Sequence, residues 1–232
     1  MANLQTQLWL KVLSLLGVMC FSAGLFAHGV DDNTKQFLTS NEGVAFLPFM
    51  YIGAKHMVTG YDHILFLVGV LFFLFRMRDV LIYVSFFTLG HSITLLYGVW
   101  ADIQVNAYLI DAIIGLSIVY KGFDNLGGFK SIFGFEPNTK AAVVIFGLFH
   151  GFGLATKLQE FNIPQEGLLQ NLIAFNIGVE LGQFFALTFV VIILSLWRKY
   201  RSYMQFTTVT NSILMSAGLM LTIFQLTGYA VQ

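Results

Sequence analysis

The segment LLQNLIAFNIGVELGQFFALTFVVIILSL, residues 168–196, decides the fold class of this chain. It is apolar almost throughout, and Glu180 is its one charged residue. An apolar stretch of about 20 residues is long enough to cross the hydrocarbon core of a bilayer as an α-helix. Because this segment is longer than that, it predicts a helix that tilts in the membrane or projects from it.

The composition of the whole chain agrees with a membrane protein. Of its 232 residues, 57% are hydrophobic and 10% are charged, and the mean hydropathy is +0.76. A soluble domain carries about 25% charged residues, so this chain cannot cover a globule with a solvated surface. Its 12 Lys and Arg balance 12 Asp and Glu, which excludes the basic surplus that a nucleic-acid binder needs. The single cysteine excludes an intrachain disulfide framework.

Five further apolar segments predict five further membrane spans. An apolar approach segment at 44–58 precedes the first of them and breaks around Thr59 and Gly60. Treated as one helix, 44–75 would be about 48 Å long, which exceeds a hydrocarbon core of about 30 Å. We therefore predict an all-α, polytopic transmembrane helix bundle of about six spans, with a signal peptide or a seventh helix at its N-terminus. The five further spans are 61–75, 79–99, 105–121, 140–158 and 205–228.

The first residues of the chain resemble a targeting segment. Residues 1–27 place Lys11 before a long apolar run that ends in small residues near Ala27, as in a secretory signal peptide. An uncleaved first helix is the competing interpretation. Cleavage after Ala27 would make His28 the N-terminus, where amine and imidazole together could bind a metal such as copper; the alternative is a histidine in a mobile leader. We expect 28–43 to be an extracytoplasmic polar segment and 44–232 to be a single transmembrane domain.

The basic residues between the predicted spans indicate the orientation of the chain. The alternate loops, 100–106 and 157–167, contain only Lys157. Cytoplasmic loops are enriched in Lys and Arg, so we predict a multi-pass protein of the bacterial inner membrane with a periplasmic C-terminus. The eight basic residues assigned to the other three loops are Arg76, Arg78, Lys121, Lys130, Lys140, Arg198, Lys199 and Arg201.

Ionisable residues inside the predicted spans are the candidate functional residues, because such groups are costly in hydrocarbon. Histidine with carboxylate suits Ni, Zn, Co, Fe or Mn in the divalent state better than Cu(I), which prefers sulfur. Helical depths predict a polar cavity open to the periplasm. Purely structural pairing and a proton relay are the alternatives. The candidate metal ligands are His56, Asp62, His63, His91, His150 and Glu180, and the candidate outer-shell or pathway residues are Asp111, Asn176, Gln183, Ser92, Thr94 and His28.

Glycine pairs accompany two of the candidate ligands. Gly147 and Gly151 flank His150, and Gly178 and Gly182 flank Glu180, each in small-xxx-small spacing. Such spacing allows helices to approach closely. It predicts that the helix of His150 packs near the helix of Glu180.

Four motifs resemble the HupE/UreJ family of bacterial membrane proteins. They are HMVTGYDHILFL at 56–67, FTLGHSITL at 87–95, FGLFHGFGLA at 146–155 and FNIGVELGQ at 175–183. The resemblance runs from about 44 to 228, and Asp111 and Asn125 also fit its pattern. It implies a six-span, permease-like protein that handles nickel or another transition metal in hydrogenase or urease contexts. It also implies that the six candidate ligands are the metal-handling positions.

Uptake of a divalent metal ion across the inner membrane is the leading hypothesis. Asp62 and His63 would replace part of the water shell of the ion, and His91, His150 and Glu180 would form a deeper site. Ligand histidines must be neutral, so acidification should weaken binding. The chain has no GxxxxGK[ST] motif, so transport would be passive, driven by potential or protons, or aided by a partner.

Two other functions remain as alternatives. An intramembrane zinc hydrolase could use Ser92 beside His91, although HExxH and GxSxG motifs are absent. A metal-binding sensor or accessory protein without transport is the third hypothesis. The expected partners are the lipid bilayer, the metal ion, and a metallochaperone or a metalloenzyme-maturation protein.

Overall fold

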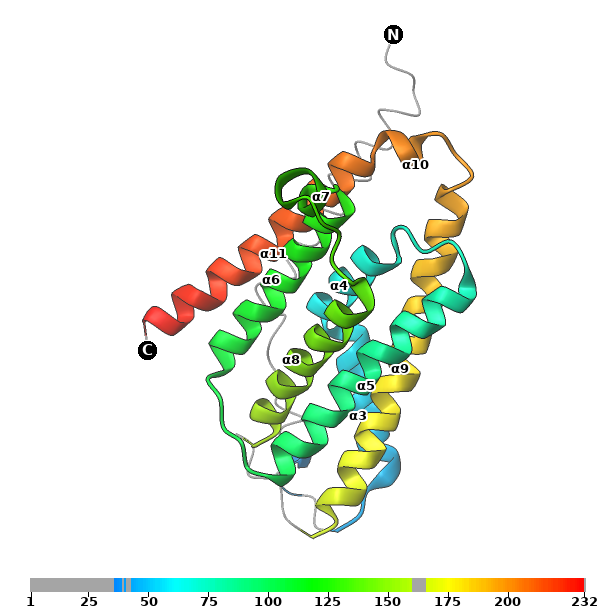
Figure 1. Ribbon diagram of the computed structural model, residues 1–232. Helices are drawn as coiled ribbons and strands as arrows, with labels where there is room; N and C mark the ends of the chain where they lie inside the picture. Colours follow the sequence, from blue (N-terminus) through cyan, green and yellow to red (C-terminus); the bar gives the residue numbers. More distant parts are fainter. Residues whose placement is uncertain (1–35, 39, 41–42, 160–165, 232) are drawn as a thin grey trace.

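The computed structural model describes residues 36–38, 40, 43–159 and 166–231, and every element bounded in these ranges is a helix (Figure 1). The predicted signal segment, His28 and most of the polar segment lie outside the described residues. The helices are α3 Phe46–Thr59, α4 Tyr61–Leu71, α5 Met77–Trp100, α6 Ala107–Asn125, α7 Gly128–Phe133, α8 Thr139–Gln159, α9 Leu168–Trp197, α10 Ser202–Gln205 and α11 Thr207–Ala230.

Four of these helices, α5, α8, α9 and α11, are long and apolar enough to cross a membrane. This confirms a multi-pass membrane protein, while the predicted number of six spans stays a prediction for the other two helices. Helix α4 has only 11 residues. Helix α6 has 19 residues but carries three charged side chains, Asp111, Lys121 and Asp124. These charges distinguish it from the four apolar spans.

The predicted break in the first membrane segment is confirmed. Helix α3 ends at Thr59, Gly60 takes an extended conformation with φ −74° and ψ 93°, and α4 begins at Tyr61. Helix α3 packs along α9, whereas α4 packs mainly against α6. Non-helical backbone at membrane depth is tolerated where it is buried in protein or lines a cavity, and transporters place ion sites at such breaks. The break at Gly60 therefore points to this part of the chain as a functional region.

Close packing of α8 against α5 is made possible by two glycines. A Cβ at Gly147 would lie 3.3 Å from the amide nitrogen of His91, and a Cβ at Gly151 would lie 2.9 Å from the carbonyl carbon of His91. The backbones of the two helices therefore approach more closely than a larger residue would allow. This packing places His91 of α5 beside His150 of α8.

The glycines of α9 allow close packing of α9 against α3. A Cβ at Gly178 would lie 2.9 Å from Cα of Met50, and a Cβ at Gly182 would lie 2.9 Å from Cα of Ala54, both on α3. The prediction that the two glycine pairs bring His150 near the helix of Glu180 is therefore wrong. The glycines of α8 pack against α5, and the glycines of α9 pack against α3.

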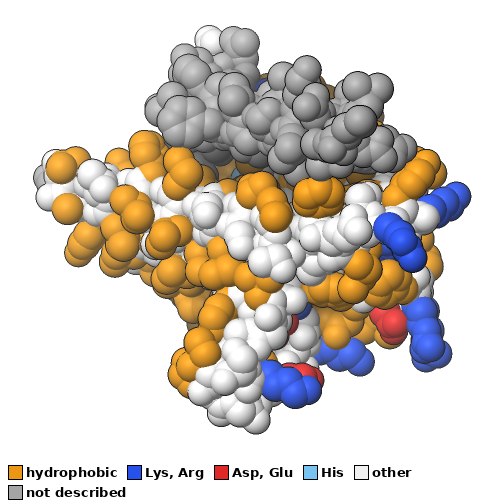
Figure 2. Space-filling model, turned by 90° about the horizontal axis from the view of Figure 1, so that it is seen from above, with side chains coloured by type: hydrophobic (Ala, Val, Ile, Leu, Met, Phe, Trp, Pro, Cys, Tyr) orange, Lys and Arg blue, Asp and Glu red, His pale blue; other side chains and the backbone are white. Residues whose placement is uncertain are grey.

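The three basic connections lie at one end of the bundle. Figure 1 shows α7, α10 and the turn between α4 and α5 at its upper end, and Figure 2, seen from that end, shows Lys and Arg side chains there. Lys121 was assigned to one of these loops, and that assignment is wrong. It lies within α6, is 6% exposed and pairs with Asp124 at 2.6 Å.

Arg198, which directly follows α9, caps the C-terminal end of the short helix α4. Arg198 Nη2 donates to the carbonyl oxygens of Leu71 and Phe72 at 2.6 and 2.9 Å, and Tyr203 Oη also donates to Phe72. The last carbonyls of a helix have no partner within it. Arg198 and Tyr203 both donate to the Phe72 carbonyl, whereas the Leu71 carbonyl also accepts from the amide of Leu74 at 3.0 Å.

Loss of this cap should destabilise the fold. We expect Arg198→Leu to lower the free energy of unfolding by about 2 kcal/mol, because a charge-assisted hydrogen bond to buried carbonyls is lost. Thermal unfolding in detergent measures the effect, with Arg201→Leu as the matched control, since Arg201 is exposed nearby. Equal melting temperatures of the two variants would show that the cap does not stabilise the fold.

Candidate metal centre

Four histidines from four different helices meet beside the break between α3 and α4. His63, at the start of α4, is the central member of this histidine cluster. Its ring centroid lies 5.3 Å from that of His56 on α3, 6.1 Å from that of His91 on α5, and 4.7 Å from that of His150 on α8. The cluster is enclosed: His63 is 3% exposed, and His91 and His150 are each 1% exposed.

Three residues of this region are close enough to share one metal ion. Asp62, His63 and His150 each offer a ligand atom, and these atoms all lie within 4.8 Å of one another. Bonds from Zn²⁺ to histidine nitrogen or carboxylate oxygen are about 2.0–2.2 Å long. Small side-chain movements would therefore bring all three donors onto one ion.

Hydrogen bonds fix the tautomers of two of these rings. His63 Nδ1 is 2.9 Å from Asp62 Oδ1, and His150 Nδ1 is 2.7 Å from the carbonyl oxygen of Phe146. A carbonyl, or an ionised carboxylate, only accepts, so in each pair Nδ1 donates and Nε2 carries the lone pair. Both Nε2 atoms are buried without a hydrogen-bond partner among the described residues. Metal-bound histidines show this arrangement, with the second nitrogen held by a carboxylate or a carbonyl.

His91 adds two further buried nitrogens, of which the neutral ring can offer one as a metal ligand. Neither ring nitrogen of His91 has a hydrogen-bond partner within the described ranges. Phe87 packs against one side of the cluster. Its ring centroid lies 6.2 Å from that of His63, 6.2 Å from that of His91 and 5.0 Å from that of His150. This apolar neighbour limits water, so an ion bound here would face a low dielectric and few competing ligands.

Asp111 does not join the histidines. Its carboxylate accepts from Lys157 Nζ at 2.8 and 3.1 Å. Asp111, a candidate outer-shell or pathway residue, therefore pairs with a lysine. Asp62 does have a histidine partner, His63.

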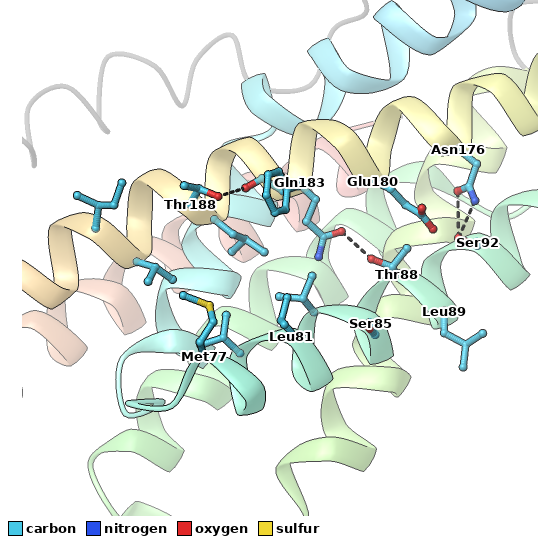
Figure 3. A pocket seen from close by; sticks show the side chains of 16 residues that line it. Met77, Leu81, Ser85, Thr88, Leu89, Ser92, Asn176, Glu180, Gln183 and Thr188 are labelled. Atoms are coloured by element: carbon cyan, nitrogen blue, oxygen red, sulfur yellow. Dashed lines mark hydrogen bonds between the residues drawn. The ribbon is translucent and has the colours of Figure 1, made fainter.

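The structure places Glu180 outside the histidine cluster. Glu180 is exposed and lines a groove of about 600 Å³ between α5 and α9, together with Asn176 and Gln183 (Figure 3). These three residues therefore share one face of α9. They meet Ser92 and Thr88 of α5, on the side of the groove opposite α9.

Polar residues on this groove bond to one another. Asn176 Nδ2 donates to Ser92 Oγ at 2.8 Å, and Thr88 Oγ1 donates to Gln183 Oε1 at 2.8 Å. Thr94 instead ties α5 to α8, because its hydroxyl donates to the carbonyl oxygen of Leu148 at 2.7 Å. These candidate outer-shell residues therefore position helices and line the groove, and none of these bonds reaches a histidine ring.

Sequence reasoning missed Gly60 as a residue of the site, and it missed the position of Lys157, which pairs with Asp111 outside the cluster. Gly60 lies against two candidate ligands, Asp62 and His63. Its position at a predicted helix break, directly before Tyr-Asp-His, could have indicated this. Lys157, read as a loop residue, lies in the last turn of α8 and reaches Asp111. No local pattern signals a contact between residues this far apart in sequence.

We expect Gly60→Ala to weaken metal binding about tenfold, as outer-shell changes do. A Cβ at this position would lie 2.9 Å from His63 Nδ1 and 3.2 Å from Asp62 Oδ1, so the ring and the carboxylate must shift. The backbone conformation itself suits alanine, since φ is −74°. Isothermal titration with Zn²⁺ measures the change, and unchanged affinity would show that the pairing of Asp62 with His63 does not set the ligand geometry.

The fold and this cluster define a class: a polytopic membrane protein with a buried histidine and aspartate site at a broken helix. A match to the family described as HupE / UreJ protein covers residues 32–232. The chain belongs to this family, as its motifs indicated, and the family is associated with nickel or cobalt transport or accessory function. No curated protein and no solved structure is detectably similar to the chain.

Proposed function

We propose that this protein is a permease for a divalent transition-metal ion in the bacterial inner membrane. The observation that carries the proposal concerns the Nε2 atoms of His63 and His150. Both are buried without a hydrogen-bond partner in the described part of the chain, while Nδ1 of each ring is held by a hydrogen bond. Buried polar atoms without partners are rare in proteins, and those present call for an explanation. A metal ion as cargo supplies one.

The charges of the site support a cation rather than an anion as cargo. Asp62 is 6% exposed, and its carboxylate lies 2.9 Å from Nδ1 of the His63 imidazole. A divalent ion would add the positive charge that this carboxylate favours. Nickel, zinc, cobalt, iron and manganese all accept such nitrogen and oxygen ligands.

The position of the cluster also supports transport. It lies at the junction of two half-helices, within a bundle whose basic connections gather at one end. By the positive-inside tendency this end is cytoplasmic, and we propose that residues 28–43 and the C-terminus face the periplasm. An enclosed site within the bundle corresponds to an intermediate stage of alternating access.

The geometry favours transport over intramembrane hydrolysis. Ser92, the candidate nucleophile, exchanges hydrogen bonds with Asn176 on the groove between α5 and α9. A hydroxyl held there does not serve a reaction at the histidine cluster. A metal-binding accessory protein without transport shares the same site, so flux separates it from a permease.

We expect Asp62→Asn to reduce Ni²⁺ flux into proteoliposomes at least about tenfold, because a neutral amide oxygen binds a divalent cation more weakly than a carboxylate. The matched control is Asp102→Asn. Asp102 is exposed and has φ 48°, a left-handed conformation that asparagine tolerates. Wild-type protein that binds Ni²⁺ but passes none would contradict the permease and favour the accessory function.

A further inference from the structure

Two partly buried ion pairs lie near the histidine cluster. Lys157 Nζ is 2.8 Å from Asp111 Oδ2, and Lys121 Nζ is 2.6 Å from Asp124 Oδ2. Asp111 is 5% exposed and Lys121 is 6% exposed. Each pair therefore places an ammonium group inside a bundle that we propose to carry a cation.

The pair of Asp111 and Lys157 lies on one side of the cluster, along α8. Gly153 follows His150 by almost one helical turn, and a Cβ there would lie 3.6 Å from Asp111 Oδ1. Lys157 follows His150 by seven residues, about 10 Å along the helix. This pair thus stands between the cluster and the end of the bundle where α8 terminates.

The pair of Lys121 and Asp124 lies on the other side, along α4. Gly69 follows His63 by six residues, about 9 Å along the helix, and a Cβ at Gly69 would lie 3.1 Å from Lys121 Cγ. Helix α4 ends near the basic end of the bundle, where α8 begins (Figure 1). The two pairs therefore stand on opposite sides of the cluster.

Stability alone gives no reason for two such pairs. Replacing a buried ion pair by well-packed apolar residues is often neutral or stabilising, because desolvation offsets the attraction between the charges. A lysine ammonium bound to a carboxylate, in contrast, occupies the oxygens that could ligate a divalent cation, and the ammonium itself repels that cation at short range. A carboxylate released from its lysine is an oxygen ligand for that cation.

We propose that the two Lys–Asp pairs control the entry of cations to the histidine cluster from its two sides. Each lysine opposes the passage of a cation while it is bound to its aspartate. Each aspartate takes up the ion when the lysine is displaced, so one positive partner replaces another without leaving a buried carboxylate unpaired. This inference rests on the proposed transport function and names the residues that control access to its site.

The rate of metal association tests the proposal. Co²⁺ bound by histidine and carboxylate absorbs visible light, so stopped-flow absorbance of the detergent-purified full chain follows entry into the cluster. We expect Lys157→Met and Lys121→Met each to raise the association rate at least about tenfold, because a repulsive charge is removed from one route. The final spectrum should be unchanged, since neither lysine is a ligand. Lys157→Arg, which keeps the charge, should bind at the wild-type rate.

A charge exchange distinguishes gating from a structural role. Asp111→Lys with Lys157→Asp rebuilds the pair with its members reversed, and we expect it to restore slow association. Asp111→Asn with Lys157→Met, which leaves no buried charge unpaired, should bind fast. Wild-type rates in this neutral variant, with a normal Co²⁺ spectrum, would overturn the gates and leave the metal site intact. Absence of any Co²⁺ spectrum in the wild type would instead overturn the proposed function.

Discussion

Replacing His63 by alanine should lower the affinity for Zn²⁺ at least about 100-fold, because loss of an outer-shell partner alone costs 10–100-fold and His63 is a candidate direct ligand. His63 is the central ring of the cluster, 4.7 Å from His150 and 5.3 Å from His56 between ring centroids. Its removal deletes one Nε2 donor and the hydrogen-bond partner of Asp62. Equilibrium titration of the purified protein measures the loss.

The control for this variant is Gln225→Ala, which also truncates a buried polar side chain. Gln225 is 3% exposed and lies on α11, which packs chiefly against α6. It should keep wild-type affinity for Zn²⁺. Retention of tight binding by His63→Ala, at normal stability, would place the metal site elsewhere in the chain.

Replacing Gly151 by alanine should have the largest effect on stability, about 3 kcal/mol, the upper end of the range for overpacking a tight contact. The added Cβ would press on the carbonyl oxygen of His91 and on Thr94 Oγ1, and it would lie 2.9 Å from the carbonyl carbon of His91. Backbone cannot yield as a flexible side chain can. Helices α5 and α8 must therefore separate, which also moves His91 away from His150.

Thermal unfolding together with Zn²⁺ titration would show both consequences of Gly151→Ala. Ala141→Val is the matched control, since it adds methyl groups at an exposed position of the same helix. Exposed substitutions of this kind change stability by about 0.5 kcal/mol or less. A Gly151→Ala protein as stable as this control would show that the close contact of α5 and α8 is not required.

Much of the fold could be predicted from hydropathy and glycine. The long apolar run that contains Glu180 forms α9, and the break expected around Thr59 and Gly60 separates α3 from α4. These features are local: the length of an apolar run sets a span, and an extended glycine ends a helix. The sequence analysis assigned His63 to the entrance and His150 to a deeper site, whereas their ring centroids lie only 4.7 Å apart in one cluster.

The face that each helix turns toward its neighbours could not be predicted from the sequence. Helix α9 is apolar on nearly every side, so periodicity does not show which face meets another helix. Glu180 consequently lies on a groove, while Gly178 and Gly182 face α3. The pairing of Asp111 with Lys157 depends on how two distant helices pack, and hydropathy assigned Lys157 to a loop.

X-ray absorption at the zinc edge of the Zn²⁺-loaded protein tests the central claim most directly. The account predicts nitrogen and oxygen neighbours at about 2.0–2.2 Å, with imidazole scattering from at least two histidines. It also predicts that this scattering weakens in His63→Ala. A first shell without imidazole, or a spectrum that His63→Ala leaves unchanged, would contradict a metal ion held by Asp62, His63 and His150.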